Sequence, residues 1–306
     1  MRGAIGVIRR VYQYAAAGCA EVVSRVPALE RPFVRFGARA WARPVIGRFY
    51  RSAVDRLAQR YRRAGSPFRT LTVCGVPLIL DVTEFTTKTL YFGRVPYEPR
   101  TTECLVQHLK DGSVFVDVGA NHGYFTSLAA ALVGATGRVV AFEPNPLVFE
   151  QLRTHVRLNG FESRVTTIEA ALADGPSDDG RLFLSQLEGN SGLSSLAPAR
   201  STLDFGWLSP AQAISVRIDT FDRWFRASGV DRIDLVKIDV EGAEDRVAAG
   251  MAGTLSSGRI RAIVCETAWD SPAHRAFCHE GFVPRLLESM DSVENVLYSR
   301  PSGTAS

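Results

Sequence analysis

From Val114 onwards, short apolar runs alternate with stretches in which apolar residues recur every three or four positions. The short runs predict β-strands and the periodic stretches predict amphipathic helices. The expected strands cover 114–118, 138–142, 165–170, 234–239, 260–266, 282–287 and 295–299. The expected helices cover 123–133, 146–159, 219–228, 243–252 and 272–280. This alternation predicts an α/β fold, in which a mostly parallel sheet is covered by helices on both faces.

Two parts of the chain depart from this pattern. The segment 174–213 is long, polar and glycine-containing, so we expect it to be a substrate loop or a mobile lid. Before Val114 we expect helices punctuated by Pro27, Pro32 and Pro44, a hairpin, an aromatic-rich loop and a lead-in helix. These cover 5–23, 31–63, 68–82, 83–100 and 101–109. The expected domains are a helical arm over 1–66, a small segment over 67–113 and the α/β domain over 114–300.

Charge is divided unevenly along the chain. The net charge is +4, but residues 1–69 hold 15 arginines and only three acidic residues. An arginine-rich amphipathic helix of this kind suits peripheral contact with an anionic membrane. The alternative is an arm that packs on the body of the protein or on a second subunit as a homodimer. Nucleic acid is a weaker partner, because no recognised binding module accompanies the arginines, and we expect none.

The cysteines and the hydropathy bear on the compartment. The five cysteines show no paired spacing, so we expect neither a disulfide framework nor a zinc cluster. No apolar run approaches the length of a membrane span, and no signal peptide is evident. We therefore expect a cytoplasmic protein, with the inner membrane face as a peripheral location.

The stretch from Val114 to Thr126 carries the first chemical signal. A buried strand ends in Asp117, and a turn with Gly119 and Gly123 leads into a helix. A glycine turn before a helix lets a ligand approach the backbone and the free N–H groups of the helix. The next strand ends in Glu143, and an acid at that position commonly binds the hydroxyls of a ribose. Together these features predict a nucleotide-type ligand.

Several segments together resemble the FkbM family of S-adenosylmethionine-dependent methyltransferases. They are Asp117–Thr126, Phe142–Pro146, Ala170–Asp174, Ile218–Asp222 and Asp234–Glu244, with Tyr97–Pro99 upstream and Asn295–Tyr298 at the end. The resemblance covers about residues 90–300, and its most specific part is Lys237-Ile-Asp-Val-Glu-Gly242. It implies a class I, Rossmann-like methyltransferase fold, with a seven-stranded sheet whose last strand is inserted antiparallel.

The resemblance also implies where S-adenosylmethionine binds. Its methionine part would lie over Asp117, Gly119, Ala120, Asn121 and Gly123, and its ribose diol would be held by Glu143. Glu169 and Ala170 would border the adenine. Thr126, Pro144 and Asn145 complete the expected cofactor-binding set.

Acidic residues near the fourth core strand are the candidates for catalysis. Lys237, Asp239 and Glu241 alternate, so on a continuing strand their side chains would share one face. We expect Asp239 to act as general base or to orient the acceptor, with Glu241 second and Lys237 as the cation that keeps them ionised. The alternative is a structural ion pair at the end of a strand.

Other residues are candidates for binding the substrate. Glu266 ends the fifth strand at the same rim, and Ser191 and Tyr97 lie in the flanking loops. Asp239, Glu241 and Glu266 offer hard oxygen ligands that suit Mg²⁺, although no metal is required by this chemistry.

The resemblance implies an O-methyltransferase that acts on a hydroxyl of a sugar, and the basic N-terminal arm favours a lipid-linked saccharide. A polyketide or other secondary metabolite is the alternative acceptor. Two other classes are a nicotinamide-dependent oxidoreductase and a non-catalytic, membrane-attached binding module. Gly119-x-x-x-Gly123 differs from the dinucleotide pattern Gly-x-Gly-x-x-Gly, which argues against the oxidoreductase. The intact acids argue against the binding module.

Overall fold

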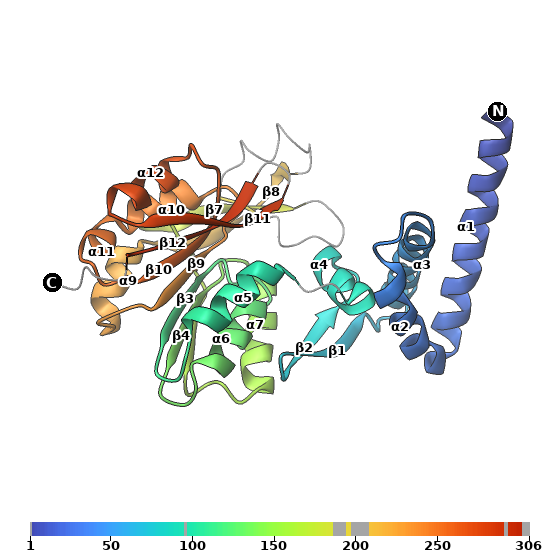
Figure 1. Ribbon diagram of the computed structural model, residues 1–306, viewed down its shortest axis with the longest axis horizontal. Coiled ribbons are helices and arrows are strands. Elements are labelled where there is room, and N and C mark those ends of the chain that lie inside the picture. Colours follow the sequence, from blue (N-terminus) through green and yellow to red (C-terminus); the bar gives the residue numbers. More distant parts are fainter. Residues whose placement is uncertain (1, 95–96, 186–193, 197–207, 291–292, 302–306) are drawn as a thin grey trace. The chain divides into compact units, whose positions relative to one another are not determined.

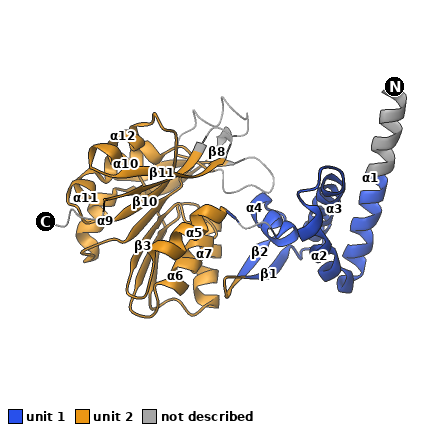
Figure 2. Cartoon of the chain, viewed as in Figure 1, with its two compact units in different colours: residues 1–72, 78–97 blue, residues 73–77, 98–306 orange. Residues whose placement is uncertain are grey.

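The structure is a computed structural model that describes residues 2–94, 97–185, 194–196, 208–290 and 293–301. The chain divides into two compact units (Figure 2). The N-terminal unit comprises residues 1–72 and 78–97, and the C-terminal unit comprises 73–77 and 98–306. This division differs from the boundaries expected at 66 and 113, because residues as far along as Val82 and Phe92 pack into the core of the N-terminal helices.

Three helices form most of the N-terminal unit (Figure 1). They are α1 (Arg2–Arg25), α2 (Glu30–Ala40) and α3 (Pro44–Arg63), with the short helix η1 (Pro27–Leu29) between α1 and α2. Pro44 divides the helical segment 31–63 as expected, and it is the first residue of α3, where the missing N–H costs no intrahelical hydrogen bond. At Gly37 a Cβ would lie 2.1 Å from the ring of Tyr50, so α2 and α3 pack closely here.

The segment after α3 is more regular than the sequence suggested. The expected hairpin is confirmed as β1 (Phe68–Val73) and β2 (Val76–Asp81). The loop expected over 83–100 is wrong, because this segment contains α4 (Phe85–Lys88), the π-helix η2 (Thr89–Gly93) and the start of α5 (Pro99–His108). Phe92 is fully buried, and its carbonyl accepts a hydrogen bond from the hydroxyl of Tyr50 at 3.1 Å. Burial of this aromatic side chain anchors the helical turns.

A seven-stranded sheet forms the centre of the C-terminal unit (Figure 1). Its strands are β3 (Val114–Val118), β4 (Arg138–Phe142), β5 (Val165–Ile168), β9 (Leu235–Ile238), β10 (Ala262–Thr267), β11 (Val283–Met290) and β12 (Val293–Ser299). They lie in the order β11-β12-β10-β9-β3-β4-β5. All pairs are parallel except those of β12, which lies antiparallel between β10 and β11. The expected fold class, with its inserted antiparallel strand, is confirmed.

Helices cover both faces of this sheet. One face carries α9 (Phe221–Ser228), α10 (Glu244–Gly250), α11 (Ala252–Ser256) and α12 (Pro272–His279). Their buried side chains form one core cluster with those of β3, β4, β9 and β10. On the other side lie α5, α6 (Tyr124–Leu132) and α7 (Pro146–Leu158) (Figure 1). The central strands β3, β4, β9 and β10 are therefore largely buried on both faces, whereas Thr166 of the edge strand β5 is exposed.

Within the described residues, much of the substrate loop or lid expected over 174–213 is strand, and 186–193 and 197–207 lie outside those residues. Residues Ser177–Ser185 form β7, which pairs antiparallel with β8 (Leu208–Asp219), and β6 (Ala171–Leu172) completes a small three-stranded sheet. The side chains of Leu182, Val216 and Ile218 are buried in it. Asp178, Asp179 and Gly180 hide this strand in the sequence, because they interrupt the apolar alternation that identifies a strand.

The register of the parallel strands brings acidic and basic residues together. Asp117 on β3 pairs with Ala141 on β4 and with Lys237 on β9. Val264 on β10 pairs with the same Lys237. The carboxyl ends of these strands therefore meet at one edge of the sheet, where open α/β sheets bind their ligands.

Gly119 generates a prediction about this edge. Its φ is +83°, and a Cβ there would lie 1.8 Å from the carbonyl oxygen of Asp239. Gly119→Ala must displace that turn in addition to adopting a left-handed backbone, so we expect it to lower the free energy of unfolding by about 3–5 kcal/mol. Gly258, with a φ of +72° and no atom within 4 Å of its Cβ position, is the matched control. Gly258→Ala should lower the free energy of unfolding, measured in urea, by only about 1–2 kcal/mol, which is the backbone cost alone. Equal losses in the two variants would contradict the close approach.

Candidate active site at the carboxyl ends of the parallel strands

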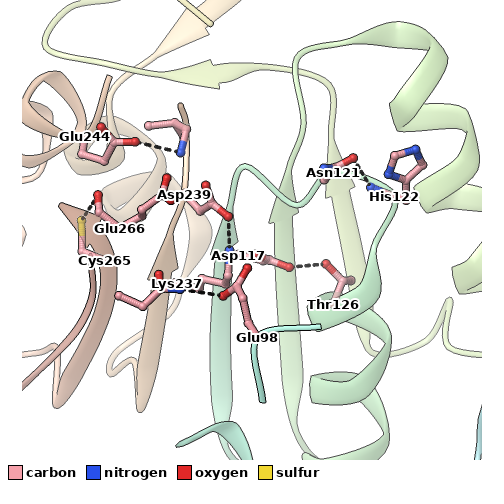
Figure 3. Close-up of polar contacts among 12 residues, drawn as sticks. Glu98, Asp117, Asn121, His122, Thr126, Lys237, Asp239, Glu244, Cys265 and Glu266 are labelled. Atoms are coloured by element: carbon pink, nitrogen blue, oxygen red, sulfur yellow. Dashed lines mark hydrogen bonds and ion pairs between the residues drawn. The ribbon is translucent and has the colours of Figure 1, made fainter. Parts of the chain in front are cut away.

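Asp117 is a buried carboxylate with one unsatisfied oxygen. Its side chain is almost completely buried, and Thr126 donates a hydrogen bond to Oδ2 at 2.6 Å (Figure 3). Oδ1 has no hydrogen-bond partner among the residues that the structure describes. Burial raises the pKa of Asp117, although the charge of Lys237 and the hydrogen bond from Thr126 oppose this. An orphaned buried acceptor of this kind suits a ligand that donates a hydrogen bond.

The turn after Asp117 holds its shape through two glycines with positive φ. Gly119 approaches the backbone of Asp239, and Gly123 approaches Leu152 of α7, where a Cβ would lie 2.6 Å from the leucine side chain. The missing Cβ at Gly123 therefore allows the start of α6 to pack closely against α7. The N–H groups of Gly119 and Ala120 donate to the carbonyl of Phe142, which ties the turn to the end of β4.

Glu143 lies at the end of β4 and accepts hydrogen bonds at both oxygens. The backbone N–H of Asn121 donates to Oε2 at 2.9 Å, and that of Asn145 donates to Oε1 at 2.8 Å. The pKa of Glu143 is raised to about 7, mainly by burial and also by the charges of Asp117 and Asp239. The two hydrogen bonds oppose this rise. A carboxylate can accept about four hydrogen bonds, so both oxygens keep room for a further donor.

The remaining expected cofactor residues lie around these two acids. The side chain of Asn145 accepts from the N–H of Leu147 at 3.1 Å and thereby caps α7. The hydroxyl of Thr126 orients Asp117, as described above. Ala120 is buried and Pro144 is half-buried beside the same strand ends, and the exposed Glu169 and buried Ala170 follow β5 at the edge of the sheet. Their direct contact with a cofactor stays a prediction.

Lys237 is a buried cation surrounded by carboxylates. Its Nζ donates to Oδ2 of Asp239 at 2.8 Å and lies 4.8 Å from the centre of the Phe125 ring. Burial alone lowers the pKa of Lys237, but the charges of Asp239, Glu98 and Asp117 outweigh this and raise it. Lys237 therefore stays protonated, so it can hold carboxylates but cannot accept a proton.

Glu98 and Asn295 belong to this network and were missed as site residues. Glu98 is buried, has a φ of 41°, and accepts a hydrogen bond from the side-chain amide of Asn295 at 3.1 Å. Figure 3 shows Glu98 beside Lys237. Both residues lie in segments that carried the family resemblance, Tyr97–Pro99 and Asn295–Tyr298, but nothing in the sequence shows that these segments meet at Lys237.

Three carboxylates, one of which is that of Asp239, form a second cluster. Asp239, Glu241 and Glu266 each place an oxygen within 4.8 Å of the others (Figure 3 shows Asp239 and Glu266). Burial and the charges of Asp239 and Glu244 raise the pKa of Glu241 well above its usual range. Burial and the charges of Asp239, Glu241 and Glu244 raise the pKa of Glu266 to about 10. The raised pKa favours the protonated form of Glu266, which can donate a hydrogen bond.

The expectation that Lys237, Asp239 and Glu241 share the face of a continuing strand is wrong. Strand β9 ends at Ile238, and Glu241 lies in a turn with a φ of 54°. Glu244, whose role the sequence did not reveal, holds this turn because its Oε1 accepts from the N–H groups of Val240 and Gly242. Ser195 donates to the carbonyl of Glu241 at 2.6 Å. The turn, rather than strand alternation, brings Glu241 to Asp239.

Ser191 and Tyr97 are the other two expected substrate residues. Ser191 lies outside the described residues. Tyr97 is the last residue of the N-terminal unit, whereas the acids belong to the C-terminal unit. Their roles stay predictions, and Glu266 is the one expected substrate residue that joins the cluster.

The shifted pKa of Glu266 predicts how stability depends on pH. Between pH 4.5, the ordinary pKa, and about pH 10, the folded protein keeps a proton on Glu266 that the unfolded chain releases. The free energy of unfolding therefore falls as the pH rises through that window. We expect Glu266→Gln to remove this loss, so that the variant becomes increasingly more stable than the wild type towards alkaline pH. Melting temperatures measured with a chelator across that window provide the test.

Glu162→Gln is the control, because Glu162 is an exposed carboxylate of the same unit. Its melting curve should follow that of the wild type at each pH. Parallel curves for wild type and Glu266→Gln would contradict the burial of an uncharged Glu266.

Comparisons with known proteins identify the family. Residues 117–289, more than half of the chain, match the methyltransferase FkbM domain. The chain is 29% identical over 167 residues to methyltransferase sdnD of Sordaria araneosa, covering 48% of this chain and 63% of that protein. It is 28% identical over 155 residues to 2-O-methyltransferase NoeI of Sinorhizobium fredii, covering 49% of this chain and 62% of that protein.

A solved structure, methyltransferase FkbM from Methylobacillus flagellatus KT, is similar with a TM-score of 0.40 and 15% identity. The similarity covers 88% of this chain and 58% of that one. The chain spans less than two thirds of the length of each of the two sequence relatives. The family match, together with the seven-stranded sheet and the acids at its strand ends, shows that this chain belongs to the FkbM methyltransferase family.

Proposed function

We propose that this protein is an S-adenosylmethionine-dependent O-methyltransferase that acts on a hydroxyl of a sugar or glycolipid-type acceptor. The observation that carries the proposal is that two sets of acidic residues, here called the first and the second group, lie at one edge of the sheet. Asp117 and Glu143 lie at the ends of β3 and β4, and Asp239, Glu241 and Glu266 cluster at the ends of β9 and β10. Gly119, whose Cβ position touches the Asp239 carbonyl, lies between them.

The first group fits the cofactor. The free Oδ1 of Asp117 would accept from an amino group of the methionine part, and the spare acceptor sites of Glu143 would receive the two ribose hydroxyls. The glycine turn between these acids leaves the backbone accessible beside the start of α6. S-adenosylmethionine, when bound, supplies a methyl group that its positively charged sulfur has already activated.

The second group fits a hydroxyl-bearing acceptor. Asp239, held by Lys237, would orient the acceptor hydroxyl and take its proton, with Glu241 as the second candidate for this role. Protonated Glu266 would donate a hydrogen bond to a neighbouring hydroxyl, which favours an acceptor with several hydroxyls. The relative NoeI is a 2-O-methyltransferase by name, which supports transfer to oxygen.

A divalent cation is an alternative occupant of the second group. Three carboxylate oxygens within 4.8 Å of one another suit the oxygen coordination of Mg²⁺. A bound cation would favour the charged carboxylates and so lower their raised pKa values. Repeating the pH series of Glu266→Gln with magnesium in place of the chelator distinguishes the cases, because a bound cation would remove the pH-dependent difference.

Binding of the cofactor should depend on the two acids at β3 and β4. We expect Asp117→Ala and Glu143→Ala each to weaken S-adenosylmethionine binding about 10- to 100-fold, because a hydrogen bond to a charged group contributes about 1.5–3 kcal/mol. Titration calorimetry of the purified variants measures this. Asp117→Asn keeps the size of the buried side chain if the alanine variant fails to fold, and Glu162→Ala is the exposed control. Unchanged affinity in both site variants would rule out this placement of the cofactor.

Methyl transfer should depend on Asp239. We expect a strain that lacks this protein to accumulate a glycolipid or polar metabolite lighter by one methyl group, and the wild-type gene to restore the heavier species. Asp239→Asn keeps the shape of the side chain but removes the general base, so it should reduce that restoration by a factor on the order of 100 or more. Mass spectrometry of lipid and polar extracts measures both species.

Glu162→Gln again serves as the control and should restore methylation fully. Full restoration by Asp239→Asn would exclude a proton-accepting role for Asp239. If the methyl group is missing from a polyketide or another secondary metabolite instead, the acceptor belongs to that class and is not a saccharide.

A further inference from the structure

Helices α2 and α3 contain a long stretch without acidic residues. Between Glu30 and Asp55 the chain has six arginines and no aspartate or glutamate. A segment of this composition has a strong positive potential, which attracts anionic surfaces. The balance differs from that of the rest of the protein, in which acidic residues outnumber basic ones from residue 70 onwards.

Six exposed residues of this stretch are grouped here as the α2–α3 patch. Arg35 and Arg39 are one helical turn apart on α2, with Phe36 beside them, and Arg43, Val45 and Ile46 follow at the turn into α3. All six are exposed. The apolar members show large exposed fractions, at 51% for Phe36 and 75% for Val45. The patch therefore combines three positive charges with three apolar side chains in contact with solvent.

The fold of the N-terminal unit makes little use of these side chains, although the ring of Phe36 meets that of Tyr50 edge-on, with 6.0 Å between the ring centroids. The opposite faces of the two helices supply its core, through Val34 on α2 and Tyr50, Val54 and Leu57 on α3. Among the residues that the structure describes, the side chains of the three patch arginines make no ion pair or hydrogen bond. Other arginines of the unit do, and Arg69 forms a 2.7 Å ion pair with Glu30. Stability of the unit thus gives no reason for the charge of the patch.

We propose that the α2–α3 patch docks the N-terminal unit on a bilayer of anionic phospholipids. Arginines can extend their stems along the apolar boundary while their guanidinium groups meet the headgroup phosphates. Phe36, Val45 and Ile46 would enter the boundary between headgroups and acyl chains. Nucleic acid would satisfy the arginines, but two exposed branched aliphatic side chains have no counterpart on a phosphate backbone. Docking is independent of methyl transfer, so it can fail while the proposed function holds.

Vesicle flotation of the full-length protein tests the proposal. Wild-type protein should float with vesicles of equimolar phosphatidylglycerol and phosphatidylcholine, and should stay in the bottom fraction with phosphatidylcholine alone. Each arginine near an anionic surface strengthens binding about fivefold, so Arg35→Gln, Arg39→Gln and Arg43→Gln combined should weaken partitioning on the order of 100-fold. Val45→Asp should also weaken it, because it places a charge at the acyl boundary.

Matched variants separate the patch from general charge. Arg157→Gln, Arg226→Gln and Arg285→Gln combined remove three exposed arginines from the C-terminal unit, and Val106→Asp changes a valine there that is 54% exposed. Both should float like the wild type. Wild-type protein that does not float with anionic vesicles, or equal losses in patch and matched variants, would overturn the proposal. So would tighter binding to RNA than to vesicles at equal phosphate, or a dimer that Val45→Asp converts into monomers, since these outcomes assign the patch to another partner.

Discussion

The buried ammonium of Lys237 is the group on which the rest of the candidate site depends. A buried cation is costly unless it is paired, and Asp239, Glu98 and Asp117 supply the compensating charge. These acids come from three separate parts of the chain, before α5, on β3 and after β9. One charge therefore ties the loop before α5 to two neighbouring core strands. The same charge opposes the rise in the pKa of Asp117, Glu241 and Glu266.

The number of hydrogen-bond donors around a buried acid distinguishes a structural acid from one that is available for chemistry. The two units provide one example of each kind. Glu30 in the N-terminal unit is buried, yet hydrogen bonds from Arg69, Tyr61 and Tyr91 satisfy it. Burial raises the pKa of Glu30, but these donors outweigh that effect and lower it. The acids at the sheet edge have few donors, and the pKa of Glu266 rises to about 10. A buried acid that the protein leaves unsatisfied is available to a ligand, as the proposed methyl transfer to a hydroxyl would require.

The glycine turn after β3 separates the two halves of the site. In the proposed function, the cofactor half would use Asp117 and Glu143, and the acceptor half would use the carboxylates around Asp239. Gly119 permits the backbone of the first half to touch the backbone of the second, because it has no Cβ. A methyl donor and a hydroxyl acceptor that bind to these halves would face one another across a short distance. Alignment of that kind is the main contribution a protein makes to such a transfer.

The sequence alone determined the order of strands and helices in the seven-stranded core, its α/β class and the acids at the ends of β3, β4, β9 and β10. Each of these follows from local periodicity and from the residue that ends a strand, so neighbouring residues suffice to predict it. Tertiary structure decided that Glu98 and Asn295 meet at Lys237, that a left-handed turn carries Glu241 to Asp239, and that β7 forms a strand within an expected loop. These features depend on which distant segments pair and on how tightly they pack, and neither the spacing nor the polarity of nearby residues records that information.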